Sequence, residues 1–190
     1  MLLLVGLGNP GSNYTNTRHN IGFKIIDAIN AHFKLSKQKP KFKGLLTTGN
    51  IDEQKIYAIK PLTFMNNSGT AIKELIDYFK IDAKDVFVFH DDMDIDFGKI
   101  KAKFGGSSAG HNGIESIDKF IGKDYSRVRI GIGHPKQKKK VNNHVLEDFK
   151  EDEEEKINDI TDNIVKQLPT LIEKKIDLFS SKVNQDLNGI

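Results

Sequence analysis

Short apolar runs alternate with amphipathic segments along this chain, and this alternation restricts the possible fold more than any other feature. A short apolar run bounded by turn residues is typical of a buried strand, and apolar residues spaced three and four positions apart indicate one face of a helix. The pattern predicts strands at 2–7, 45–51, 55–59, 86–89, 100–104 and 128–132, and helices at 21–33, 68–79, 113–120 and from 151 onward. Because strands and helices alternate, we expect an α/β fold. We predict a single-domain three-layer sandwich over residues 1–190, with a central, mostly parallel mixed sheet and helices on both faces.

Two helix boundaries can be predicted from single residues. Ser68 is a preferred type of N-cap residue for the second helix. Pro169 is expected to separate the helix that starts near Glu151 from a last helix, because proline breaks the helical hydrogen-bond pattern. Residues 151–190 would then form two C-terminal helices, and the lysine-rich segment 134–144 is expected to be a mobile loop.

The composition limits the chemistry and the location. The chain has 190 residues and no cysteine, which excludes disulfides, cysteine-based zinc sites and thiol catalysis. The apolar run at residues 1–5 lacks a basic segment and is too short for a signal peptide or a membrane span. We therefore expect a cytoplasmic protein that does not contact a membrane.

Charge is distributed unevenly along the chain. Residues 1–150 carry 24 Lys and Arg against 16 Asp and Glu, whereas residues 151–190 carry 5 against 10. A basic body is typical of a protein with an anionic partner, and nucleic acid is the leading candidate. The alternative is an ordinary lysine-rich solvated surface, and charge alone does not decide between the two.

A glycine motif near the N-terminus resembles a dinucleotide-binding fingerprint. The sequence Gly6-x-Gly8-x-x-Gly11 follows a predicted strand, as that fingerprint requires. However, Pro10 removes a backbone N–H from the turn that would hold the phosphates, and helix signals begin only near Asn20. The motif therefore does not predict a nucleotide cofactor.

Two further motifs match known patterns without the context that those patterns need. Gly106-x-Ser108-x-Gly110 matches the nucleophile elbow of serine hydrolases, but it lies in a long glycine-rich stretch instead of a tight strand–turn–helix. Asp92-x-Asp94-x-Asp96 matches the start of a calcium loop, but Phe97 and Lys103 occupy its glycine and glutamate positions. A serine hydrolase built on Ser108 stays open as an alternative, and we interpret the acidic run as a solvated turn.

Polar residues that follow the predicted strands could form a hydrolytic site. His19 lies in the loop after the first strand and Asp91 follows the strand at 86–89, and ligands collect at the carboxyl ends of parallel strands. A carboxylate beside an imidazole fixes its tautomer and raises its basicity, as general-base catalysis requires. Asn9, Asn66 and Asn112 would add amides for a carbonyl group and a water molecule. Asp91 and the three asparagines could instead be turn or cap residues, and His19 could be a hydrogen-bonded structural residue.

Six ordered motifs resemble those of the bacterial peptidyl-tRNA hydrolase family. They are 5–11 (VGLGNPG), 17–22 (TRHNIG), 61–66 (PLTFMN), 90–94 (HDDMD), 110–113 (GHNG) and 129–135 (RIGIGHP). The motifs span almost the whole chain at compatible spacing. Ser107 and Ser108 stand where other members often carry Gly or His.

The resemblance implies hydrolysis of the ester that joins a peptide to the 3′-terminal ribose of tRNA, without metal or cofactor. His19 would be the general base, Asp91 would keep it basic, and Asn112 would hold the water and the substrate carbonyl. Asn9 would favour peptidyl-tRNA over tRNA that carries a free amino acid. The chain would act as a monomer on the acceptor stem and 3′ end of peptidyl-tRNA.

Further residues receive binding roles from the same resemblance. Asn66 and Met65 would line the peptide groove, with Tyr14 and Phe64 near the terminal nucleotide. Lys103 and Arg129 would bind tRNA phosphates. Residues 134–149 would form a gate loop and short helix over the groove. A non-catalytic RNA-binding module on the same fold remains the second alternative, although binding alone does not require a His19–Asp91 pair.

Overall fold

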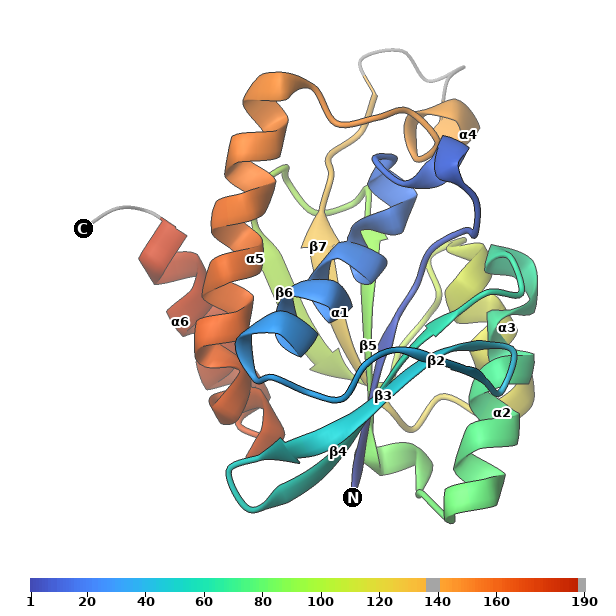
Figure 1. Cartoon of the computed structure of the whole chain (residues 1–190). Helices are drawn as coiled ribbons and strands as arrows, with labels where there is room; N and C mark the ends of the chain where they lie inside the picture. Colours follow the sequence, from blue (N-terminus) through green and yellow to red (C-terminus); the bar gives the residue numbers. More distant parts are fainter. Residues whose placement is uncertain (136–140, 188–190) are drawn as a thin grey trace.

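The computed structural model describes residues 1–135 and 141–187, and this part of the chain forms one seven-stranded sheet in the order β2-β3-β4-β1-β5-β7-β6 (Figure 1). The strands are β1 Leu2–Gly6, β2 Lys39–Lys41, β3 Gly44–Ile51, β4 Gln54–Pro61, β5 Val86–Asp92, β6 Ile100–Phe104 and β7 Ser126–Gly131. β1 pairs in parallel with β4 and β5, and β5 pairs in parallel with β7. The outer pairs are antiparallel, so the sheet is mixed, as predicted.

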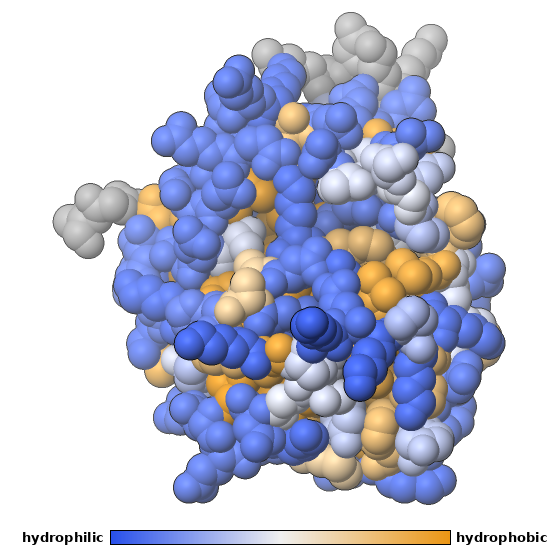
Figure 2. All heavy atoms as spheres, in the orientation of Figure 1, coloured by the Kyte–Doolittle hydropathy of each residue, from blue (hydrophilic) through white to orange (hydrophobic). Residues whose placement is uncertain are grey.

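Helices cover both faces of this sheet, which confirms the predicted α/β layers. They are α1 Ile21–His32, α2 Ser68–Phe79, α3 Asn112–Ile121, α4 Val141–His144, α5 Glu151–Ile172 and α6 Ile176–Leu187. Short 3-10 turns occur at η1 Ser12–Tyr14, η2 Arg18–Asn20, η3 Met65–Asn67 and η4 Ala83–Asp85. Among the described helices, none is both long enough and apolar enough to cross a membrane. Hydrophilic residues cover most of the face shown in Figure 2.

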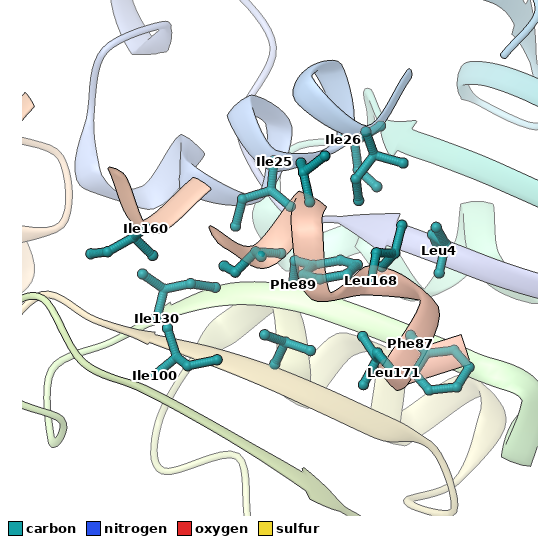
Figure 3. Close-up of a cluster of buried hydrophobic side chains, with 14 of the residues drawn as sticks. Leu4, Ile25, Ile26, Phe87, Phe89, Ile100, Ile130, Ile160, Leu168 and Leu171 are labelled. Carbon is teal, nitrogen blue, oxygen red and sulfur yellow. The ribbon is translucent and has the colours of Figure 1, made fainter. Parts of the chain in front are cut away.

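Each face of the sheet has its own apolar cluster. Leu2 and Leu4 of β1 face α1, α5 and α6, whereas Leu3 and Val5 face α2 and α3. Figure 3 shows the first cluster, in which side chains of α1 and α5 point towards β1, β5 and β7. Because both faces are covered, β1 and β5 are buried along their whole length. This burial fixes the central strands, and the site is built at their carboxyl ends.

The edge strand β6 is covered by side chains of α6. The backbone N–H of Ile100 donates to Asn184 Oδ1 at 3.0 Å, and the Ile100 carbonyl accepts from Asn184 Nδ2 at 2.9 Å. The N–H of Ala102 donates to Ser180 Oγ at 2.8 Å. A helix that binds these backbone groups protects the edge from pairing with another strand.

Two of the predicted helix boundaries are wrong. α5 continues through Pro169 and ends at Ile172, because buried Leu168 and Leu171 hold its last turn against the sheet. Ser68 is the first residue inside α2 and not its N-cap. Its hydroxyl donates to the Met65 carbonyl at 2.9 Å, so it joins the helix to the preceding turn.

Candidate active site

The loops that follow β1, β4 and β5 meet the start of α3 around one cavity of about 460 Å³. The cavity lies at the carboxyl ends of the parallel strands, where α/β folds place their ligands. Its lining includes seven of the predicted site residues: Asn9, His19, Phe64, Met65, Asn66, Asp91 and Asn112. The other three predicted residues, Tyr14, Lys103 and Arg129, are not part of this lining.

The central pair of the cavity is His19 and Asp91. β5 extends to Asp92, past its predicted end at residue 89, and this extension carries the Asp91 carboxylate to the η2 turn that holds His19. His19 Nδ1 lies 2.8 Å from Asp91 Oδ1 and 3.0 Å from Oδ2. A proton on Nδ1 therefore donates to the carboxylate, which leaves Nε2 of His19 as a proton acceptor.

Electrostatics make this pair a base and its counter-ion. Burial lowers the pKa of His19, but the charge and hydrogen bond of Asp91 raise it by more, so the net pKa lies above its ordinary value. Burial raises the pKa of Asp91, but the two imidazoles of His19 and His111 lower it by more, so Asp91 is ionised.

His111 is the second imidazole on Asp91, and its tautomer is fixed by the backbone. Its Nδ1 accepts from the N–H groups of Gly113 at 3.1 Å and Ile114 at 3.3 Å, and so caps α3. The proton must then sit on Nε2, which donates to Asp91 Oδ1 at 3.0 Å. The sequence prediction gave His111 no role, because histidine is not one of the usual N-cap residues.

His90 supports Asp91 from the sheet side. Its Nδ1 donates to the Asp91 carbonyl at 2.7 Å, and its ring lies 4.8 Å from the ring of His111. His90 is fully enclosed, with only 3% of its surface exposed. Complete burial, followed by the nearby His111, holds the pKa of His90 well below its ordinary value, so His90 is a neutral structural donor.

Asn9 is held by hydrogen bonds from two other loops. Its N–H donates to Asn20 Oδ1 at 2.8 Å, and its carbonyl accepts from Asn20 Nδ2 at 2.9 Å. Its own Oδ1 accepts from the N–H of Met65 at 2.8 Å. Because this oxygen is occupied, the side-chain NH₂ of Asn9 is the group that remains to donate to a ligand. Asn20, which sequence reasoning missed, orients Asn9 through its main chain.

Phe64 stands at the rim of the cavity with an unfavourable backbone. Its φ of 57° and ψ of 159° lie in a region that is nearly restricted to glycine, at a cost of about 1–3 kcal/mol. Its side chain is 56% exposed. The bond from Met65 to Asn9 and a 3.1 Å bond from the Asn67 N–H to the Phe64 carbonyl hold this conformation. Strain of this kind is typical of residues kept in place for binding.

Lys103 and Arg129 line a separate hollow along β6 and α6. Arg129 Nε donates to Asp92 Oδ2 at 2.7 Å, which connects the hollow to the residue next to Asp91. Burial, together with the positive charges of Arg129 and Arg127, lowers the pKa of Lys103. Cations held this close together favour an anionic ligand such as a phosphate.

His19, Asp91 and His111 are also the one group within residues 1–135 and 141–187 whose ligand atoms, all within 4.8 Å of one another, could hold a metal ion. The hydrogen bonds do not favour this use. Because two backbone N–H groups bind Nδ1 of His111, its Nε2 carries a proton where a metal would need a lone pair. The arrangement is better suited to hydrogen bonds in which both imidazoles donate to the Asp91 carboxylate.

Comparison with known proteins identifies the family. The family model described as peptidyl-tRNA hydrolase matches residues 3–189. The chain belongs to the peptidyl-tRNA hydrolase family. The peptidyl-tRNA hydrolase of Pelagibacter ubique is 72% identical over 184 residues, which cover 97% of this chain and 99% of that protein. The peptidyl-tRNA hydrolase of Ehrlichia ruminantium is 46% identical, with 95% and 93% covered.

The fold agrees with solved structures of peptidyl-tRNA hydrolases. The crystal structure of the enzyme from Acinetobacter baumannii matches with a TM-score of 0.90 at 34% sequence identity, and covers 97% of this chain and 94% of that one. A complex of peptidyl-tRNA hydrolase with N-propanol gives the same score and coverage. The predicted fold class is therefore confirmed.

The peptidyl-tRNA hydrolase resemblance predicted a mobile gate loop and short helix at residues 134–149. Residues 136–140 lie outside the part of the chain that the structure describes. Val141–His144 forms α4, and Val145 and Leu146 line the cavity, so this segment does contribute to the site. Its mobility stays a prediction.

Proposed function

We propose that this chain hydrolyses the ester bond between the peptide and the 3′-terminal ribose of peptidyl-tRNA, releasing free tRNA and peptide. The observation that carries this proposal is the His19–Asp91 pair in a cavity ringed by Asn9, Asn66 and Asn112. All these groups come from one chain, so the proposed active form is a monomer, and its proposed location is the cytoplasm.

The proposed reaction proceeds by general-base catalysis. His19 Nε2 takes a proton from a water molecule, and the water oxygen attacks the ester carbonyl carbon. Asp91 stabilises the imidazolium ion that forms, while amide N–H groups of Asn112 and Asn66 donate to the oxyanion. When the tetrahedral intermediate collapses, His19 returns the proton to the departing 3′-oxygen of the ribose. No covalent enzyme intermediate, metal or cofactor enters this scheme.

Substrate selection follows from the free amide of Asn9. Its NH₂ would donate to the carbonyl of the peptide bond before the last residue, and an aminoacyl-tRNA with a free amino group has no such carbonyl. Met65 would line the peptide groove. Tyr14 and Phe64 would lie near the terminal nucleotide, and Lys103 and Arg129 would bind phosphates of the acceptor stem.

The test is release of tRNA from N-acetyl-aminoacyl-tRNA, with unblocked aminoacyl-tRNA as the comparison substrate. We expect cleavage of the blocked substrate only, and a fall in kcat by a factor of about 10²–10⁴ in His19→Ala. His32→Ala, which alters an exposed histidine on α1, is the matched control. Normal turnover by His19→Ala would contradict the role of His19 as the general base. Binding of tRNA without any cleavage would favour the RNA-binding module instead.

The serine hydrolase alternative gains no support from the geometry around Ser108. Its hydroxyl lies 3.4 Å from Glu115 Oε1 and accepts from the N–H of Gly110 at 3.3 Å. α3 begins at Asn112, so the tight turn of a nucleophile elbow is missing here. A fluorophosphonate probe should leave Ser108 unlabelled, and labelling would restore this alternative.

A further inference from the structure

Residues 144–149, which we call the cover segment, lie directly against the loop that carries His19. In Figure 1, α4 and the chain after it lie beside the dark-blue segment that follows β1. Three backbone N–H groups form hydrogen bonds between the two segments: Arg18 to Glu147 at 3.1 Å, His19 to Val145 at 2.8 Å and Phe149 to Asn16 at 3.2 Å. The position of the catalytic loop and that of the cover segment are therefore coupled.

The side chain of Arg18 reinforces this junction from inside the protein. Arg18 is 3% exposed, and Nη1 donates to the carbonyls of Glu147 at 3.2 Å and His144 at 3.4 Å. Nη2 donates to Glu153 Oε2 at 2.7 Å, in the first turn of α5. The guanidinium also lies over the Phe149 ring, 5.5 Å from its centre. The planar guanidinium group of Arg18 thus joins the His19 loop, the cover segment and α5.

We propose that Arg18 is a positioning residue that sets where the cover segment closes the cavity above His19. The inference rests on the proposed function of this site. Val145 and Leu146 line the cavity, and Leu146 is 46% exposed, so it presents an apolar edge that a bound substrate would cover. The carbonyls that Arg18 binds, those of His144 and Glu147, flank these two residues on either side.

This geometry separates the effect of Arg18 from that of Asp91. Asp91 acts on the imidazole of His19 and therefore on the chemical step. Arg18 acts on the cover segment, so we expect it to affect substrate binding more than the chemical step. Lysine cannot replace Arg18 here. Its ammonium group is a compact charge on one nitrogen, whereas the two Nη atoms of the guanidinium bind two carbonyls and the Glu153 carboxylate at the same time.

The test compares Arg18→Lys with the matched control Lys24→Met. Lys24 binds Glu154 in the same first turn of α5 at 2.8 Å and lies over the ring of Phe149, the last residue of the cover segment. The bonds to the carbonyls of His144 and Glu147 are made by Arg18, so this control keeps them. Loss of a charged hydrogen bond at the junction should raise KM of Arg18→Lys by about tenfold. We expect its kcat to stay within about threefold of the original, because the groups around His19 are unchanged.

Two further measurements separate positioning from general destabilisation. Melting temperatures show whether both variants are folded, and Lys24→Met should lose stability without a change in KM. Amide hydrogen exchange should accelerate at Arg18 and His19 in Arg18→Lys and stay unchanged at these two residues in Lys24→Met. Unchanged exchange and an unchanged KM in Arg18→Lys would overturn the inference. If the unmodified protein cleaved no substrate, the proposed function would fail, while hydrogen exchange would still decide the role of Arg18.

Discussion

Asp91 accepts hydrogen bonds from two imidazoles, and this arrangement predicts how activity depends on pH. His19 must be neutral to act as a base, so kcat/KM should rise with pH through the raised pKa of His19 and level off above it. In Asp91→Asn the charge that raises this pKa is lost, and burial alone lowers it. The rise should therefore move to lower pH, while the plateau falls by on the order of 10².

The measurement for Asp91→Asn is a pH–rate profile of kcat/KM with N-acetyl-aminoacyl-tRNA. His32→Ala serves again as the control and should keep the original profile. An unchanged midpoint in Asp91→Asn would mean that Asp91 does not set the basicity of His19.

Phe64 allows the strain at the cavity rim to be measured. Replacement by alanine keeps a side chain at positive φ, whereas glycine adopts this conformation freely. We expect Phe64→Gly to be more stable than Phe64→Ala by about 1 kcal/mol, the reverse of the usual order for these two residues. Urea denaturation of both variants gives the difference. Greater stability of the alanine variant would show that Phe64 is not strained.

Single residues also show what the sequence could reveal about the site. His19, Asp91, Asn9 and Asn66 were predictable because each follows an apolar run, and the carboxyl ends of parallel strands converge. Asn112 reaches the site differently, from the start of α3, because the strand before it, β6, is antiparallel. The partners of these residues were not predictable. His111, Asn20 and Arg18 act through bonds across 20, 11 and 129 positions of the chain, and such pairs depend on how the loops pack.

Among the elements, the contact between α6 and β6 gives a stability prediction. Asn184→Ala removes both bonds to the backbone of Ile100 and leaves the edge of β6 unpaired at that point. We expect a loss of about 1–2 kcal/mol and a melting temperature lower by about 2–8 °C. Gln185→Ala, at an exposed position of the same helix, is the control and should melt normally. Equal melting of both variants would contradict the proposed role of Asn184.

The elements themselves were largely predictable from apolar periodicity, and their ends were less so. The strand at 86–89 extends to Asp92 because polar residues are tolerated where β5 enters the site. α5 continues through Pro169 because burial of Leu168 and Leu171 outweighs the local effect of proline. In both cases tertiary contacts override a local signal, and a single sequence does not contain those contacts in readable form.

For the molecule as a whole, the hollow along β6 and α6 that Lys103 and Arg129 line predicts how activity depends on salt. If Lys103 and Arg129 bind tRNA phosphates, log kcat/KM should fall linearly with log salt concentration. Lys103→Gln and Arg129→Gln should each reduce the slope by about 1. Lys84→Gln is the control, because Lys84 lies in η4, at the amino end of β5 and opposite the site. Slopes that stay unchanged in the first two variants would place the phosphates elsewhere.

The central position of β1 has a consequence for the protein's own synthesis. β1 and His19 are made before their partners, because β1 pairs with β4 and β5, and the site also needs Asn112 of α3 and the cover segment. While residue 149 of a growing chain is still inside the ribosome, His19 of that chain therefore lacks some of the residues that complete its site. Such a chain is itself esterified to a tRNA. Because its last site residues are made late, such a chain would not cleave its own bond to tRNA before the site is complete.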